Sequence, residues 1–198
     1  MNYRSIAAVV AGLCVCTGAA IAQQTKSEKA PEKKMEMPKP GPEVKKLGYF
    51  VGSWKTETEA KPNTIMPAGK TTEISKCEWF PGGFHVVCHT TGNGPMGARQ
   101  LGILGYDSDA KAYTYYGIGS ASGGAASSKG TVDGSTWTYT SNDKMGGKTV
   151  QGRYTITEVS PTSQTFKFET SDDGQTWTEV MEGKATKAVS KAAPVEKK

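Results

Sequence analysis

Apolar and polar residues alternate along several stretches of the chain with a period of two. The pattern is clearest late in the sequence, where one face would carry Val150, Gly152, Tyr154 and Ile156 and the other Gln151, Arg153, Thr155 and Thr157. The next stretch repeats it, with Phe166 and Phe168 set against Thr165, Lys167 and Glu169. Successive side chains of a strand point to opposite faces, so these stretches predict strands with one apolar and one polar face. Such strands are typical of antiparallel sheets that cover a core.

Turn-forming residues interrupt the alternation roughly every 8 to 12 residues, a spacing that is typical of β-sandwiches and β-barrels. The turns are Pro81-Gly82-Gly83, Gly92-Asn93-Gly94-Pro95, Asp107-Ser108-Asp109, Ser122-Gly123-Gly124, Asp133-Gly134, Gly146-Gly147, Ser160-Pro161 and Asp173-Gly174. We therefore predict an all-β fold, a single antiparallel barrel of about 8 to 10 strands with disordered tails at both ends.

A short sequence recurs at two of the turns. Asp133-Gly134-Ser135-Thr136-Trp137 returns as Asp173-Gly174-Gln175-Thr176-Trp177. Asp-Gly is a strong signal for a hairpin with a type I′ turn. The repeat predicts two similar hairpins, each with its Trp on the inward face.

Cys77 and Cys88 flank the turn at Gly82 and Gly83. If the hairpin turns about these glycines, Cys77 faces Cys88 and Trp79 faces Val86. Pro81 cannot donate a ladder hydrogen bond, which favours a four-residue loop. The cysteines then form a non-hydrogen-bonded pair with Cα atoms about 4.5 Å apart, within the range of a disulfide. We predict a Cys77–Cys88 disulfide; the alternative is two buried free thiols.

The same register places the two histidines of the chain. His85 and His89 fall on the face opposite the cysteines, and we expect both to meet solvent. Residues i and i+4 of a strand lie about 13 Å apart, too far to share one metal ion. The sequence therefore predicts no metal site and no cofactor.

Residues 1–22 have the features of a secretory signal peptide. Arg4 precedes an apolar run from Ile6 to Cys16, and Ala20-Ile21-Ala22 matches a cleavage site. We predict cleavage after Ala22 and a periplasmic or secreted protein without a transmembrane segment, because no later apolar run approaches about 20 residues. A lipidated Cys14 or Cys16 is the alternative, although the residues before each cysteine fit a lipoprotein signal poorly.

Charge is distributed unevenly along the chain. The whole sequence has a formal charge of +5, but Gln23 to Lys46 alone holds seven Lys against four Glu, and Lys184 to Lys198 holds five Lys against one Glu. The region between them has eleven basic and fourteen acidic residues, which argues against binding to nucleic acid. We predict a disordered linker over 23–46, a barrel domain over 47–184 and a Lys-rich disordered tail over 185–198. The tails are either solvated spacers or contacts to anionic envelope surfaces.

Several motifs resemble those of known families. Gly52-Ser53-Trp54 is similar to the Gly-x-Trp that opens the first strand of lipocalins and other calycin-type barrels. With Trp79-Phe80-Pro81-Gly82-Gly83, Leu101 to Asp107, Lys111 to Tyr116, and Asp173-Gly174 with Trp177, the chain resembles the bacterial DUF1579 family across Leu47 to Lys184. The resemblance implies a calycin-like barrel and no particular chemistry.

Two related barrel families bear on individual residues. Nitrobindins bind haem through a histidine late in the chain, and this sequence has no His after His89. In lipocalins an Arg of a late strand often covers the opening Trp, which implies Arg153 over Trp54. The alternation places Arg153 on the polar face instead.

These observations favour a barrel that binds a small, partly apolar ligand without catalysis. The candidate lining residues are Trp54, Trp79, Trp137, Tyr154, Phe166 and Phe168. An alternative is that the same aromatic side chains fill the barrel, leaving a structural or interaction protein of the envelope; a cavity of several hundred Å³ would decide between the two. A further alternative is an envelope enzyme with an inward carboxylate, such as Glu57 or Glu73, as its base, since the chain has no Ser-His-Asp pattern, nucleophile elbow or phosphate loop.

Overall fold

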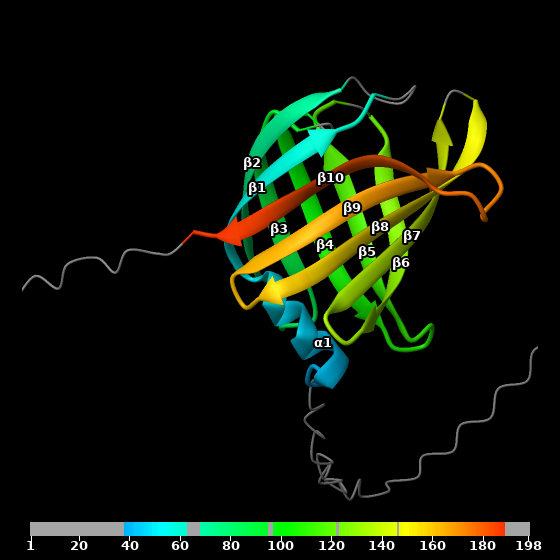
Figure 1. Cartoon of the computed structure of the whole chain (residues 1–198). Helices are drawn as coiled ribbons and strands as arrows, with labels where there is room; N and C mark the ends of the chain where they lie inside the picture. Colours follow the sequence, from blue (N-terminus) through cyan, green and yellow to red (C-terminus); the bar gives the residue numbers. More distant parts are fainter. Residues whose placement is uncertain (1–37, 63–67, 95–96, 122, 146, 189–198) are drawn as a thin grey trace, which may run out of the picture. The chain divides into compact units, whose positions relative to one another are not determined.

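Ten antiparallel strands form a closed barrel in a computed structural model of the protein, which describes residues 38–62, 68–94, 97–121, 123–145 and 147–188 (Figure 1). The strands are β1 (Gly52–Ala60), β2 (Gly69–Trp79), β3 (Val86–Gly92), β4 (Arg99–Asp107), β5 (Ala112–Gly119), β6 (Ala125–Asp133), β7 (Thr136–Met145), β8 (Lys148–Ser160), β9 (Ser163–Ser171) and β10 (Thr178–Lys187). The predicted signal peptide, most of the predicted linker and residues 189–198 lie outside the described residues.

Each strand pairs with its neighbours in sequence, and β1 also pairs with β10 to close the barrel. The predicted all-β antiparallel barrel is confirmed. All eight predicted turns fall between consecutive strands, from β2–β3 to β9–β10. The connection from β1 to β2 was missed, although Pro62 and Pro67 in it are turn-favouring residues. None of the helices in the described ranges is long and apolar enough for a membrane crossing.

A short helical segment lies at one end of the barrel (Figure 1). It consists of α1 (Pro42–Lys46) and the 3₁₀ helix η1 (Leu47–Phe50). Pro42 occupies the first helical position and lysines end the last turn, both favourable for a helix. Val44, Leu47 and Phe50 are buried, and the Tyr113 hydroxyl donates to the Glu43 carbonyl at 3.1 Å. The helix α1 therefore lies within the predicted linker over 23–46.

At the other end of the domain sequence, β10 extends past the predicted boundary at residue 184. Ala185, assigned to the tail, is 1% exposed, and Lys187 pairs with Trp54 of β1. The seam between β1 and β10 needs these residues because it closes the barrel. β10 therefore includes residues 185–187, which the sequence assigned to the tail.

The opening Trp54 is held in place by the segment before it. Gly52 has a φ of 128°, which favours glycine, where the chain leaves η1 and enters β1. The Trp54 indole N–H donates to the Phe50 carbonyl at 2.7 Å, and the Lys187 ammonium lies 4.9 Å from the ring centroid of Trp54. The basic residue over Trp54 is thus Lys187.

Arg153 instead lies on the polar face, as the alternation indicates. Its guanidinium lies 4.0 Å over the ring of Trp177 and its Nε donates to Glu169 at 2.9 Å. Lys167 donates to the other Glu169 oxygen at 3.0 Å. Arg153 therefore joins a cluster on the outer surface and does not cover Trp54.

The β2–β3 hairpin has the predicted register. Cys77 pairs with Cys88 and Trp79 with Val86, and the cysteines form a disulfide with Cα atoms 4.0 Å apart. The Phe80 N–H donates to the His85 carbonyl at 2.8 Å, which encloses the predicted four-residue loop. His85 and His89 are exposed, so both predictions for this hairpin are confirmed.

The repeated Asp-Gly sequence has two different structures. In the first copy the loop has two residues, and only the first of them, Gly134, has a positive φ, of 54°. This is the pattern of a type II′ turn and not of the predicted type I′ turn. At the second copy Asp173 accepts hydrogen bonds from the Gln175 and Thr176 N–H groups at 2.8 and 2.7 Å, within a longer loop between β9 and β10. Trp177 therefore meets Arg153 outside the barrel, and the prediction that it faces inward is wrong.

Candidate functional site

A cavity of about 740 Å³ lies inside the barrel. Inward side chains from β1 to β10 line it, and Phe50 and Trp54 contribute at the end covered by the helical segment. The volume falls within the range of about 300 to 1,000 Å³ that small-molecule sites occupy. The centre of the barrel is therefore not filled by its own side chains.

Four of the six predicted lining residues face this cavity: Trp54, Tyr154, Phe166 and Phe168. Trp137 does not, because it is packed 4.9 Å from the Phe50 ring and 4.7 Å from the Tyr113 ring, with its indole N–H bonded to Glu158 at 2.6 Å. Trp137 belongs to the core at the covered end, where it is 1% exposed.

Trp79 also lies outside the cavity. It is the last residue of β2 and is 37% exposed. Its ring packs against Gly48 of η1, where an added Cβ would lie 3.5 Å from the Trp79 ring. The period-two alternation of β2 places Trp79 on the inward face, as predicted. However, Trp79 ends β2 and lies beyond the part of the strand that lines the cavity. These two tryptophans are corrections to the predicted site.

One wall of the cavity is aromatic and apolar. Tyr154 of β8 stacks on Phe166 of β9 with ring centroids 5.5 Å apart and an interplanar angle of 21°, and Phe168 follows at 6.4 Å. Ile156 and Met181 extend the same wall. It offers flat apolar surface to a ligand.

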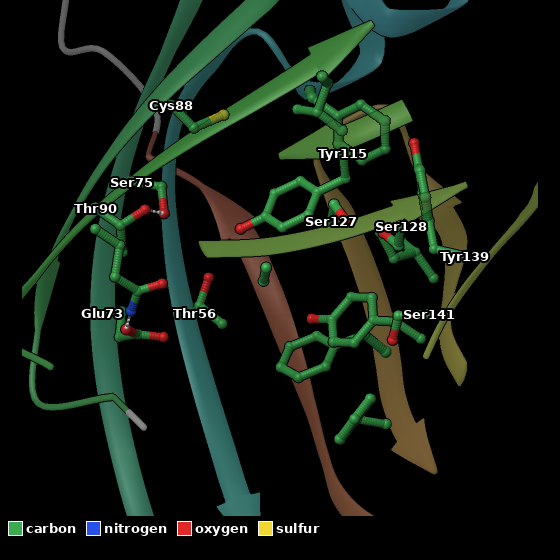
Figure 2. A pocket seen from close by; sticks show the side chains of 18 of the residues that line it. Thr56, Glu73, Ser75, Cys88, Thr90, Tyr115, Ser127, Ser128, Tyr139 and Ser141 are labelled. Carbon is green, nitrogen blue, oxygen red and sulfur yellow. Dashed lines mark hydrogen bonds between the residues drawn. The ribbon is translucent and has the colours of Figure 1, made fainter. Parts of the chain in front are cut away.

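The opposite wall is polar, and Figure 2 shows it from close by. Ser75 Oγ of β2 and Thr90 Oγ1 of β3 are in hydrogen-bond contact at 2.7 Å, and the Gln100 amide of β4 donates to a Glu73 carboxyl oxygen. Of these residues, only Glu73 was predicted from the sequence. The alternation along β2 also indicates an inward Ser75, because Glu73, Ser75 and Cys77 follow one another at intervals of two residues.

Tyr115 of β5 reaches across from the side, and its hydroxyl points into the cavity (Figure 2). Two inward glycines make room for its ring. A Cβ at Gly117 would lie 2.4 Å from the Tyr115 hydroxyl oxygen, and one at Gly102 would lie 3.1 Å from the ring. The missing side chains therefore let the ring lie along the wall and leave the centre empty.

The ionisable groups of the cavity are mainly acidic. Burial raises the pKa of Glu73, and the hydrogen bond from Gln100 offsets only part of this effect. Asp143 of β7 also lines the cavity and accepts from Ser141 at 2.6 Å. Glu57, the other predicted base, is instead on the outer face, bonded to Lys55 at 2.8 Å and Lys184 at 3.1 Å. The prediction of an inward Glu57 is wrong.

Two buried polar atoms on the cavity lining have no partner among the described residues: the Tyr139 hydroxyl and the Gln164 side-chain oxygen. Burial raises the pKa of Tyr139 far above its ordinary value, so the hydroxyl stays neutral and can donate or accept. Buried polar groups are normally paired in proteins. Both atoms are themselves buried, so a ligand would reach them only after a side-chain movement.

A profile of the family described as "Protein of unknown function (DUF1579)" matches residues 39–187. The chain belongs to the DUF1579 family. The match includes α1 and all of β10, so the family's domain has the bounds of the barrel described above. No curated protein sequence matches the chain significantly.

Solved structures that are similar to this DUF1579 protein have low sequence identity to it. Rv2717c from M. tuberculosis is 11% identical with a TM-score of 0.50, over 75% of this chain and 99% of that one. The S-type phycobiliprotein lyase CPES from Guillardia theta is 9% identical with a TM-score of 0.46, over 75% of this chain and 93% of that one.

Proposed function

We propose that this DUF1579 protein is an exported, non-catalytic binding protein that holds a small, partly apolar ligand inside its barrel. The cavity of about 740 Å³ carries the proposal, because a barrel that served only as a structural unit would gain stability by filling it. Its two unlike walls suit a ligand with both an apolar and a polar part.

Export is supported by the signal-peptide features of residues 1–22 and by the disulfide, which persists in oxidising compartments. The lysines outside the barrel support attachment of the tails to anionic envelope surfaces. Mass spectrometry of the mature protein from its own host tests the export step. A first residue at Gln23 supports it, and a retained residue 1–22 segment contradicts it.

Glu73 supports a second candidate function, an envelope enzyme with an inward carboxylate as general base. Glu73 faces a cavity and its pKa is raised. General bases of enzymes often have both properties. If the protein is an enzyme, Glu73→Gln should still bind the compound that the wild type converts but should no longer convert it. A binding protein returns the compound unchanged from both the wild type and the variant.

The decisive experiment is native mass spectrometry of the protein purified from its own host, with two variants that introduce the same ring. Thr56 lines the cavity, whereas Thr72 is exposed on the neighbouring β2. We expect a copurifying small molecule on the wild type and on Thr72→Phe, and its loss from a folded Thr56→Phe. A copurifying molecule that survives Thr56→Phe places binding elsewhere and contradicts the proposal.

A further inference from the structure

We infer that the cavity selects ligands whose polar end is a protonated amine and rejects those whose polar end is a carboxylate. The inference rests on the proposed binding function and names the chemical class of the ligand. It depends on the position of Glu73, on the other charges of the cavity and on the aromatic wall opposite.

The Glu73 carboxyl can bind a ligand through one of its two oxygens. Gln100 donates to one of its oxygens, and Figure 2 shows the other oxygen directed toward the interior of the cavity. Thr56 of β1 and the bonded pair Ser75 and Thr90 lie on the same wall. An ammonium has three N–H donors, so one can bond to Glu73 while others reach these hydroxyls.

No basic side chain among the described residues forms an ion pair with Glu73. Asp143 adds a second carboxylate on the cavity, from β7. Among the described lining residues the single basic one is Lys144, which is exposed and alternates with Asp143 on β7, so it points away from the interior. A buried carboxylate without a cationic partner is unfavourable, and a cationic ligand supplies that partner.

The aromatic wall completes the receptor. Tyr154, Phe166 and Phe168 form an aromatic wall on the side of the cavity opposite Glu73. Their rings would pack against the apolar part of the ligand, and their quadrupoles attract a cation. A carboxylate in the same place would face two like charges, and a neutral alcohol would leave Glu73 without a counter-charge.

The test compares three probes that share one chain and differ in their polar end: octylamine, 1-octanol and octanoate. Binding to the full mature protein is measured by titration calorimetry at pH 7.5 and low salt. The variant is Glu73→Gln, which keeps the shape and removes the charge. The control is Glu78→Gln, the same change on the exposed face of β2. Asp143→Asn is a second variant, and thermal unfolding verifies that each variant is folded.

We expect the wild type to bind octylamine at least tenfold more tightly than octanol, and octanoate more weakly than both. Glu73→Gln removes the preference for octylamine and leaves the octanol affinity within about twofold, because an apolar contact does not depend on the carboxylate. Asp143→Asn reduces the preference partly, and Glu78→Gln leaves it unchanged.

The inference is overturned if octanoate binds as well as octylamine, or if a folded Glu73→Gln keeps the full preference. If Glu73→Gln does not fold, the order of the three probes on the wild type decides alone. Octanol binding without an amine preference refutes the inference and leaves the binding function intact. If neither the three probes nor a neutral apolar dye bind, the binding function itself has failed.

Discussion

Replacing both Cys77 and Cys88 with alanine removes the cross-link of the β2–β3 hairpin. The bridged residues are 11 positions apart. For a loop of this length the chain-entropy relation gives a loss of about 2.8 kcal/mol at 25 °C. For a domain of this size each kcal/mol lowers the Tm by about 2 to 4 °C, so we expect the double variant to unfold about 6 to 11 °C earlier.

The structure indicates that this loss acts mainly through the unfolded chain. Cys77 and Cys88 both line the cavity, so removing their sulfur atoms mainly enlarges an existing space. The unfolded chain, in contrast, becomes freer and exposes more surface. We therefore expect the urea m-value to rise slightly while the native spectrum stays the same.

The assay is urea and thermal unfolding of the double variant and of the wild type, each with and without dithiothreitol. The reductant should lower the stability of the wild type to that of the variant and leave the variant unaffected. A loss below about 0.5 kcal/mol, well under the entropic value, would refute the reasoning. A loss with a changed native spectrum would show instead that the disulfide shapes the folded barrel.

Three further predictions concern single residues. Burial raises the pKa of Glu73, so this carboxyl binds its proton more tightly in the folded state. The wild type should therefore lose stability relative to Glu73→Gln as the pH rises above about 4.3. Urea unfolding at pH 4 and pH 7 should show this difference in stability growing with pH, and a constant difference contradicts the prediction. A Cβ at Gly183 would lie 2.3 Å from the Glu57 carbonyl oxygen and 2.5 Å from the Phe166 ring, so Gly183→Ala should cost about 1 to 3 kcal/mol by urea unfolding. Its control, Gly69→Ala, has no atom within 4 Å and should stay within about 0.5 kcal/mol; equal effects would refute the steric argument. Lys187→Met keeps the apolar stem and removes the cation over Trp54, and should cost about 0.5 to 2 kcal/mol, which unchanged unfolding would contradict.

Much of the site was accessible from local pattern. The alternation in β8 and β9 placed Tyr154, Phe166 and Phe168 on the inward face, where they line the cavity. The same reasoning applied to β2 would have found Ser75 beside Glu73. It failed for Trp79 and Trp137, because a strand's period shows which face a side chain occupies but not how far along the barrel axis it lies.

The repeated Asp-Gly sequence shows where local pattern fails more fully. Both copies predict a tight hairpin, and only the first forms one, with Trp137 in the core. In the second copy Ser171 and Asp173 bond to the backbone of the following residues and hold a longer loop. Side-chain hydrogen bonds to nearby N–H groups compete with strand pairing, and the surroundings decide which arrangement is more stable.

By itself the sequence determined what depends on neighbours along the chain. Period-two alternation and turn residues specify antiparallel strands, and the positions of Gly82 and Gly83 align Cys77 with Cys88 across their hairpin. The tertiary structure alone decided what depends on closure. The pairing of β1 with β10 brings Lys187 to Trp54. Whether that interior is filled or empty is set by the summed volume of inward side chains from ten strands, which no single stretch of sequence contains.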